Sequence, residues 1–222
     1  ADLLFSDTQM ATYENQQSAL FFIESLAADG GTEMYSPLSQ ALVMKRNPKQ
    51  AAKAIRQIVF ITDGAVSNEF ELMRLLDSAR DDYRLYTVGI GAAPNGYFMK
   101  KAAQFGRGSY VFIQNTQQVQ SKMAELMLKI SQPAVTDIQL MFDHQIHPKL
   151  EVFPAKIPDL YYGDPIQVAV KSQLPLSSVQ LQGLTANDTW YHQLIIDNNQ
   201  ESKGISTLWA RRKIEDLLDS LV

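Results

Sequence analysis

Cysteine is absent from the 222 residues of this chain, which excludes disulfide bonds, thiolate metal sites and a cysteine nucleophile. No apolar run approaches the roughly 18 residues that a membrane-spanning helix needs, so we expect no membrane span. The net charge is only -4, and this slightly acidic balance argues against nucleic acid as a partner, because phosphates attract basic surfaces. The first residues lack a basic region and a cleavage-site pattern, so no signal peptide is visible.

The most informative segment that is present is the apolar run 58–62, which is followed at once by Asp63 and Gly64. A run this apolar is typical of a central strand in a parallel sheet. Asp63 then stands at the carboxyl end of that strand, where open α/β sheets place their ligand sites. The ordinary interpretation of Asp-Gly is a turn. Thr32, which follows Gly31 in a glycine turn, presents a hydroxyl that we expect at the same edge of the sheet.

The first part of the chain alternates between helix-like and strand-like patterns. Thr12 is a candidate cap for a helix that ends at Gly30, and Asn68 with Glu71 has the spacing of a capping box. Further strands are predicted at 85–90 and 109–113, with helices at 37–45, after Asn68, at 97–104 and at 119–130. This order predicts right-handed βαβ units and therefore a parallel sheet with flanking helices, a partial Rossmann-like α/β fold.

After Pro133 the apolar period changes from helical to two. Alternating positions around Leu140, Val170, Leu181 and Leu194 predict short antiparallel strands in a β-sandwich. An apolar face near the end predicts a carboxyl-terminal helix. We therefore expect an α/β domain at 1–132, a β-sandwich at 133–206 and a carboxyl-terminal helix at 207–222.

An ordered series of motifs resembles the von Willebrand factor A domain as it occurs in the inter-α-trypsin inhibitor heavy-chain family. The resemblance is greatest to the bacterial branch of that family, the marine proteobacterial sortase-target proteins. It covers nearly all of the chain. The motifs are Gly30-Gly-Thr-Glu-Met34, Val59-Phe-Ile-Thr-Asp-Gly64, Val88-Gly-Ile-Gly91, Gly106-Arg-Gly-Ser-Tyr110, Thr136-Asp-Ile138, Ile157-Pro-Asp-Leu160 and Leu208-Trp-Ala-Arg-Arg-Lys-Ile214.

The resemblance implies a non-catalytic cell-surface adhesion module that uses a metal-dependent adhesion site. Thr32 and Asp63 would be metal ligands, and Gly31, Thr32 and Asp63 would form the ligand-binding residues. Mg or Mn is expected in the full-length protein, where an acidic protein or matrix ligand would bind through the metal. Hard cations of this kind take oxygen ligands. The implied location is extracellular or on the cell surface, with sortase anchoring in the parent protein.

The family's Asp-x-Ser-x-Ser motif does not occur in these 222 residues. The resemblance therefore implies a domain that is truncated at both ends and lacks its first strand and its Asp-x-Ser-x-Ser loop, so that metal binding by this chain is absent or weak. Strand 58–62 would then be an exposed edge with unpaired N–H and C=O groups, which allows self-association.

Two other classes of function stay open. One is a structural inter-domain module without metal-dependent binding. The other is an enzyme, which is the least supported because no nucleophile–base constellation or phosphate-cradling loop occurs. His144 and His147 could form a metal pair but lack a third ligand nearby, so a loop or strand-end pair is the preferred interpretation. His192 belongs to an alternating row and is interpreted as structural.

Overall fold

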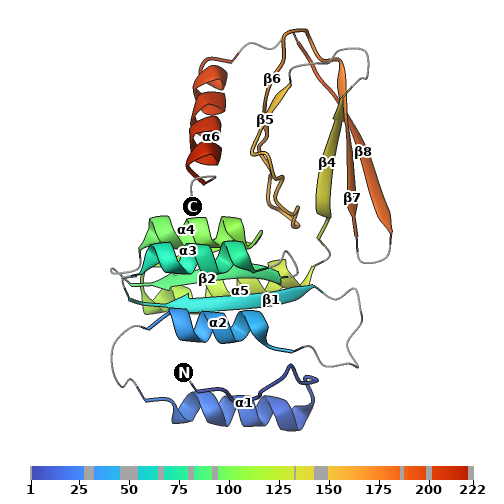
Figure 1. Cartoon of the computed structure of the whole chain (residues 1–222). Coiled ribbons are helices and arrows are strands. Elements are labelled where there is room, and N and C mark those ends of the chain that lie inside the picture. Colours follow the sequence, from blue (N-terminus) through green and yellow to red (C-terminus); the bar gives the residue numbers. More distant parts are fainter. Residues whose placement is uncertain are drawn as a thin grey trace. The chain divides into compact units, whose positions relative to one another are not determined.

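The computed structural model describes residues 2–27, 33–45, 55–64, 68–79, 83–91, 95–132, 134–142, 150–185, 188–198 and 202–219. The chain divides into two compact units, Ala1–Val119 and Gln120–Val222, and each is described by itself (Figure 1). The division into domains at 132 and 206 stays a prediction.

The first unit is an α/β layer around a parallel sheet. Its strands occur in the order β1-β2-β3, and β2 pairs in parallel with both neighbours. This confirms the predicted parallel sheet with flanking helices. The elements are α1 (Tyr13–Ser25), α2 (Tyr35–Val43), β1 (Arg56–Thr62), α3 (Glu69–Ser78), β2 (Tyr83–Ile90), α4 (Gly96–Phe105), β3 (Tyr110–Ile113) and the short 3-10 helix η1 (Thr116–Gln118).

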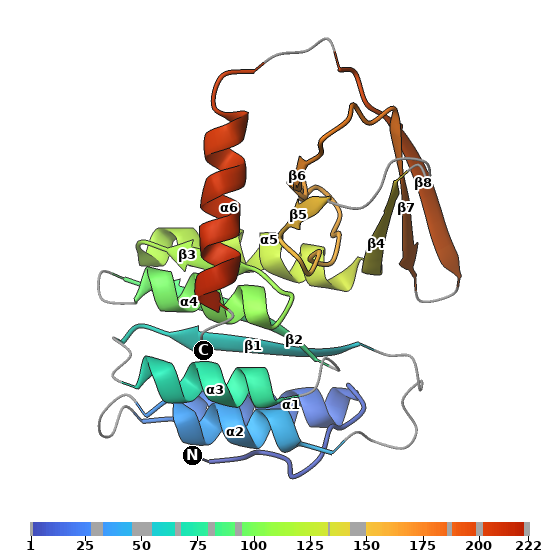
Figure 2. The same cartoon turned by 45° about the horizontal axis from the view of Figure 1, so that its top comes forward.

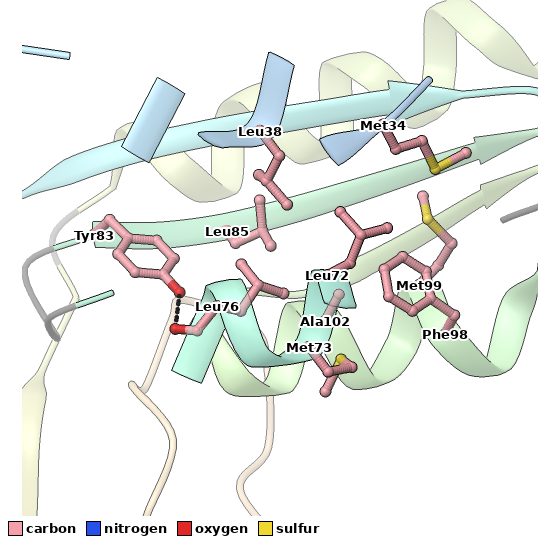
Figure 3. Close-up of a cluster of buried hydrophobic side chains, with 10 residues drawn as sticks. All are labelled: Met34, Leu38, Leu72, Met73, Leu76, Tyr83, Leu85, Phe98, Met99 and Ala102. Atoms are coloured by element: carbon pink, nitrogen blue, oxygen red, sulfur yellow. Dashed lines mark hydrogen bonds between the residues drawn. The ribbon is translucent and has the colours of Figure 1, made fainter. Parts of the chain in front are cut away.

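The core of this unit lies where α2, α3 and α4 meet β2 (Figure 3). Leu38, Leu72 and Met99 from the three helices are at most 3% exposed, as is Leu85 of β2. The Tyr83 hydroxyl in the same cluster donates a hydrogen bond of 3.0 Å to the carbonyl of Leu76, so its polar end is satisfied inside an apolar core. Burial of these side chains is the main stabilisation of the unit.

The sheet has its most buried strand at β2 and an open edge at β1. Tyr86 and Val88 of β2 are fully buried, as is Leu85 on its other face. β1 pairs only with β2 among the residues that the structure describes, and Ile61 is 52% exposed. The run 58–62 has the sequence of a central strand but stands at an edge of the described sheet. This is the arrangement expected if no strand covers its other side.

Two capping predictions concern the starts of helices α1 and α3. The Thr12 side chain accepts a hydrogen bond of 3.3 Å from the Asn15 N–H, which confirms the predicted cap. α3 begins after Asn68 as expected, but the Asn68 side chain makes no capping hydrogen bond and its backbone is not extended. The predicted capping box with Glu71 is therefore wrong, because an N-cap side chain reaches the first turn only from the extended conformation.

The second unit consists of two antiparallel sheets with helices. The larger sheet has the order β4-β7-β8, and β5 pairs with β6. This confirms the predicted antiparallel strands and the carboxyl-terminal helix. The elements are α5 (Val119–Ser131, which begins at the unit boundary), β4 (Thr136–Phe142), β5 (Glu151–Phe153), β6 (Ala169–Lys171), β7 (Ser178–Leu184), β8 (Thr189–Ile195) and α6 (Ile205–Asp219).

In both views of the second unit the β5–β6 pair lies between α6 and the β4-β7-β8 sheet (Figures 1 and 2). Trp209 of α6 packs edge-on against Phe153 with ring centroids 6.0 Å apart. The Lys171 and Lys213 ammonium groups lie 4.6 Å and 4.9 Å from the centre of the Trp209 ring. Cation–π contacts of this kind, together with the apolar area of the indole, hold α6 against β5 and β6.

Candidate functional site

The candidate site of the first unit is the edge where the parallel strands end. Thr62 of β1 is in register with Gly89 of β2, which is in register with Phe112 of β3. The carboxyl ends of all three strands therefore meet at one edge. Gly91 follows β2 there with a φ of 82°, and its N–H donates a hydrogen bond of 2.9 Å to the carbonyl of Ile113. Loops that follow parallel strands form ligand sites at this edge in α/β folds.

Asp63 lies at this edge, directly after β1, and its side chain is exposed. The chain turns immediately beyond it, because the Gly64 N–H donates a hydrogen bond of 3.2 Å to the hydroxyl oxygen of Thr62. That bond occupies Thr62 and leaves the Asp63 carboxylate facing solvent. The turn interpretation and the ligand interpretation of Asp63 are therefore compatible, since the turn presents the carboxylate outward.

The starts of α3 and α4 are tied together by side chains. Asn95 caps α4, where its side-chain oxygen accepts a hydrogen bond of 3.1 Å from the Phe98 N–H. Its amide nitrogen donates to the carboxylate of Glu69, the first residue of α3. No sequence signal pairs these two residues, because they stand 26 positions apart. The contact fixes the start of α3 relative to the start of α4.

The other predicted ligands cannot be placed in the same way. Gly31 and Thr32 lie outside the described residues, and so do His144 and His147. The convergence of Thr32 with Asp63 therefore stays a prediction. Within the described ranges no group of three or more His, Cys, Asp or Glu side chains is arranged to hold a metal ion. Asp63 alone fits a hard cation as one carboxylate ligand, since Mg²⁺ is commonly held by one or two carboxylates and several waters.

His192 and Asp164, two polar residues of the second unit, have structural contacts. His192 of β8 stacks on Trp190 with ring centroids 5.8 Å apart, which agrees with its structural interpretation. Asp164 forms an ion pair with Lys129 of α5, and the Lys129 ammonium also lies 5.4 Å from the centre of the Tyr161 ring. These contacts join α5 to the 161–164 turn.

Residues 1–112 match the family model for the von Willebrand factor type A domain. The chain belongs to the von Willebrand factor type A domain family. The matched range includes all three strands of the parallel sheet apart from the last residue of β3, and it contains the edge with Asp63. Proteins of this family are generally non-catalytic modules that bind other proteins.

Relatives with a von Willebrand factor A domain span much longer chains. The von Willebrand factor A domain-containing protein 5B1 of Mus musculus is 27% identical over 162 residues, which is 72% of this chain and 13% of that protein. Inter-alpha-trypsin inhibitor heavy chain H2 of Sus scrofa is 22% identical over 220 residues, which is 95% of this chain and 23% of that protein. The chain thus spans less than a quarter of either relative's length.

The fold also agrees with a solved structure, a von Willebrand factor type A protein from Catenulispora acidiphila. The TM-score is 0.60 at 16% sequence identity, and the match covers 90% of this chain and 57% of the other. The matched part of this chain includes residues of both units, and the likeness concerns the fold alone.

Among the described residues, no helix is both long and apolar enough to cross a bilayer.

Proposed function

We propose that this chain is a non-catalytic binding module of a cell-surface adhesion protein, and that its ligand meets the carboxyl edge of the parallel sheet. The observation that supports this best is the exposed Asp63 carboxylate, which stands directly after β1 at that edge in a family of interaction modules. The parent would be an extracellular, sortase-anchored bacterial protein related to the inter-α-trypsin inhibitor heavy chains.

In this proposal the ligand is an acidic protein or matrix component that binds through Mg²⁺ or Mn²⁺. Asp63 and Thr32 would hold the ion, Gly31 would let the backbone approach closely, and further oxygen ligands would come from the longer protein. When bound, the cation offers a coordination position to a carboxylate of the partner. The Glu69–Asn95 contact keeps the starts of α3 and α4 in a fixed relative position, which reduces the reorganisation needed for binding.

The test is capture of a carboxylate-bearing partner by the longer protein in the presence of Mg²⁺, followed by chelation. We expect Asp63→Ala to lower capture at least tenfold, and Asp77→Ala to leave it unchanged. Asp77 is a matched control because it is an exposed carboxylate at the opposite end of α3. Equal capture by the two variants, or capture that survives chelation, would refute a metal-dependent role for Asp63.

A structural inter-domain module without metal-dependent binding is the second candidate. It is supported by the small share of the relatives' length that the chain covers, 13% and 23% in the two examples above, since such a segment has further chain to connect in those proteins. In this case chelation and Asp63→Ala would both leave binding unchanged, while removal of the segment would change the arrangement of its neighbours.

We also propose self-association through the exposed strand 58–62. β1 lacks the Lys, Pro or bulge that usually protects an edge strand, and Ile61 is 52% exposed. Ile61→Lys would add a charge to this edge and is expected to lower any association that uses it.

A further inference from the structure

The second unit has an open sheet edge of its own at β8. Among the described residues β8 pairs only with β7. The Ile196 N–H donates a hydrogen bond of 2.9 Å to the carbonyl of Ser177, and the Thr185 N–H donates one of 2.8 Å to the carbonyl of Asp188. Backbone N–H and C=O groups alternate in direction along an antiparallel strand, so those of the even-numbered residues of β8 point toward β7. The N–H and C=O groups of Tyr191, Gln193 and Ile195 therefore point away from the sheet.

The two edges of this sheet differ in how they are protected. At the β4 edge, Asp137 has a φ of 51° at a register irregularity, and Val135 just before the strand forms an isolated bridge with Leu160. Bulges and inserted charges are devices that stop edge strands from pairing. β8 has none of these devices, since its sequence Thr-Trp-Tyr-His-Gln-Leu-Ile contains no lysine, proline, glycine or carboxylate.

Both faces of β8 carry exposed apolar side chains. Tyr191 and Ile195 on one face are 64% and 87% exposed, and Leu194 on the other face is 47% exposed. The face with Leu194 also lines a cavity of about 1030 Å³ between the two sheets of this unit. The lining of that cavity is mainly apolar and includes Leu140, Phe142, Val170, Leu176, Leu181 and Trp190. Two of its apolar lining side chains stay exposed, Leu194 of β8 at 47% and Leu174 at 56%.

We propose that β8 pairs with β8 of a second copy of this chain, antiparallel and about a two-fold axis at Gln193. The outward N–H and C=O groups of Gln193 then bond to those of its symmetry mate, and Tyr191 exchanges hydrogen bonds with Ile195 of the other copy. His192 faces Leu194 of the other copy on the cavity side. The two three-stranded sheets become one continuous sheet.

The side-chain chemistry of β8 favours this occupant over an apolar small molecule. Antiparallel self-pairing places Tyr191 opposite Ile195 twice, which is a favourable cross-strand pair of an aromatic and a β-branched residue. No carboxylate or lysine faces another across the axis. An acyl chain in the cavity would cover Leu194 but would leave Tyr191, Ile195 and the outward backbone groups in water, whereas a second strand covers all of them.

The test is sedimentation velocity of the whole chain over concentrations from about 1 μM to about 1 mM, the range suited to a weak interface. Gln193→Pro removes an N–H that points outward, and proline is tolerated at such edge positions. Gln193→Thr is the matched control, because it keeps the N–H and a strand-forming side chain. We expect the wild type and Gln193→Thr to dimerise within about twofold of each other, and Gln193→Pro to dimerise at least tenfold more weakly.

Ile195→Lys is a second variant whose folding is not in question, because this side chain is 87% exposed, and it is also expected to weaken the dimer at least tenfold. In the wild type, amide exchange at Tyr191, Gln193 and Ile195 is expected to slow as concentration rises. A wild type that stays monomeric, or dimers unaffected by Gln193→Pro and Ile195→Lys, would overturn the proposal. Association lost only on Ile61→Lys would assign it to β1 instead, so the two edges are told apart.

Discussion

Gly108→Ala is expected to destabilise the chain strongly, because a methyl group at this position meets backbone. A Cβ on Gly108 would lie 2.0 Å from the carbonyl oxygen of Leu85 and 2.6 Å from its carbonyl carbon. The same loop is bonded to β2, since the Leu85 N–H donates a hydrogen bond of 2.9 Å to the carbonyl of Gly106. Leu85 is 1% exposed, so β2 has no free space into which it can shift.

Overpacking of a well-packed core typically costs about 1–3 kcal/mol, and a clash with backbone belongs at the upper end of that range. We therefore expect Gly108→Ala to lower the free energy of unfolding by about 3 kcal/mol. For a chain of this size each kcal/mol shifts the thermal midpoint by about 2–4 °C, so the midpoint should fall by about 6–12 °C. Thermal and urea unfolding followed by far-UV circular dichroism measure both quantities.

Gly96→Ala is the matched control. Gly96 is the first residue of α4, and a Cβ there would meet only the Tyr110 hydroxyl at 3.5 Å, which is an ordinary contact. Replacement of glycine by alanine at a compatible helical position stabilises by about 0.4–1 kcal/mol. If Gly108→Ala unfolded within about 0.5 kcal/mol of the wild type, as surface substitutions do, the close approach of this loop to β2 would be refuted.

Two further predictions concern polar contacts. The hydrogen bond from Lys213, at 2.5 Å, lowers the pKa of Glu151 from 4.5, so the stabilisation from this pair is present above pH 4.5 and is lost as the pH falls through the lowered value. Lys213→Met should therefore reduce the loss of stability between pH 7 and pH 4 that urea unfolding measures, and an equal loss in both proteins would contradict it. The buried Thr87 hydroxyl donates a hydrogen bond of 2.8 Å to the carbonyl of Met99, so Thr87→Val should cost about 1 kcal/mol in urea unfolding. Thr207→Val, at an exposed helical position, should stay within about 0.5 kcal/mol of the wild type, and equal effects of the two valine substitutions would contradict a role for the buried hydroxyl.

Much of the first unit follows from apolar periodicity. The strands at 85–90 and 109–113 and the helix at 97–104 agree with β2, β3 and α4 to within a few residues. β2 begins earlier, at Tyr83, and includes a buried arginine, Arg84, which is 4% exposed. A charged side chain interrupts the apolar pattern that predicts a strand, so this pattern alone places the start of β2 too late.

Other features depend on contacts between residues that are distant in sequence. β5 contains only Glu151–Phe153, and three residues are too few to show an alternation. Its pairing with β6 defines it as a strand. The contact between Glu69 and Asn95 is likewise a product of the fold, since it joins the starts of two helices. The position of Asp63 at the end of a strand, by contrast, can be predicted from the sequence, because the apolar run 58–62 stands directly before it.

Helix α1 is predicted from the sequence, but the burial of its apolar face is not. Its apolar period is visible in the sequence, and the helix forms at Tyr13–Ser25. Leu20 and Ile23 nevertheless remain 53% and 62% exposed. An amphipathic pattern predicts that a face will be buried, but it does not specify which surface covers it.

The most direct test of the proposed cation site is the broadening of backbone amide NMR signals of the whole chain by paramagnetic Mn²⁺. Weak binding at the proposed site should broaden the signals of Thr32 and of Thr62 to Gly64 before any others, and Asp63→Ala should abolish this pattern while Asp77→Ala preserves it. Broadening that is spread over the acidic surface and is the same in Asp63→Ala would contradict a cation site at the carboxyl edge of the sheet.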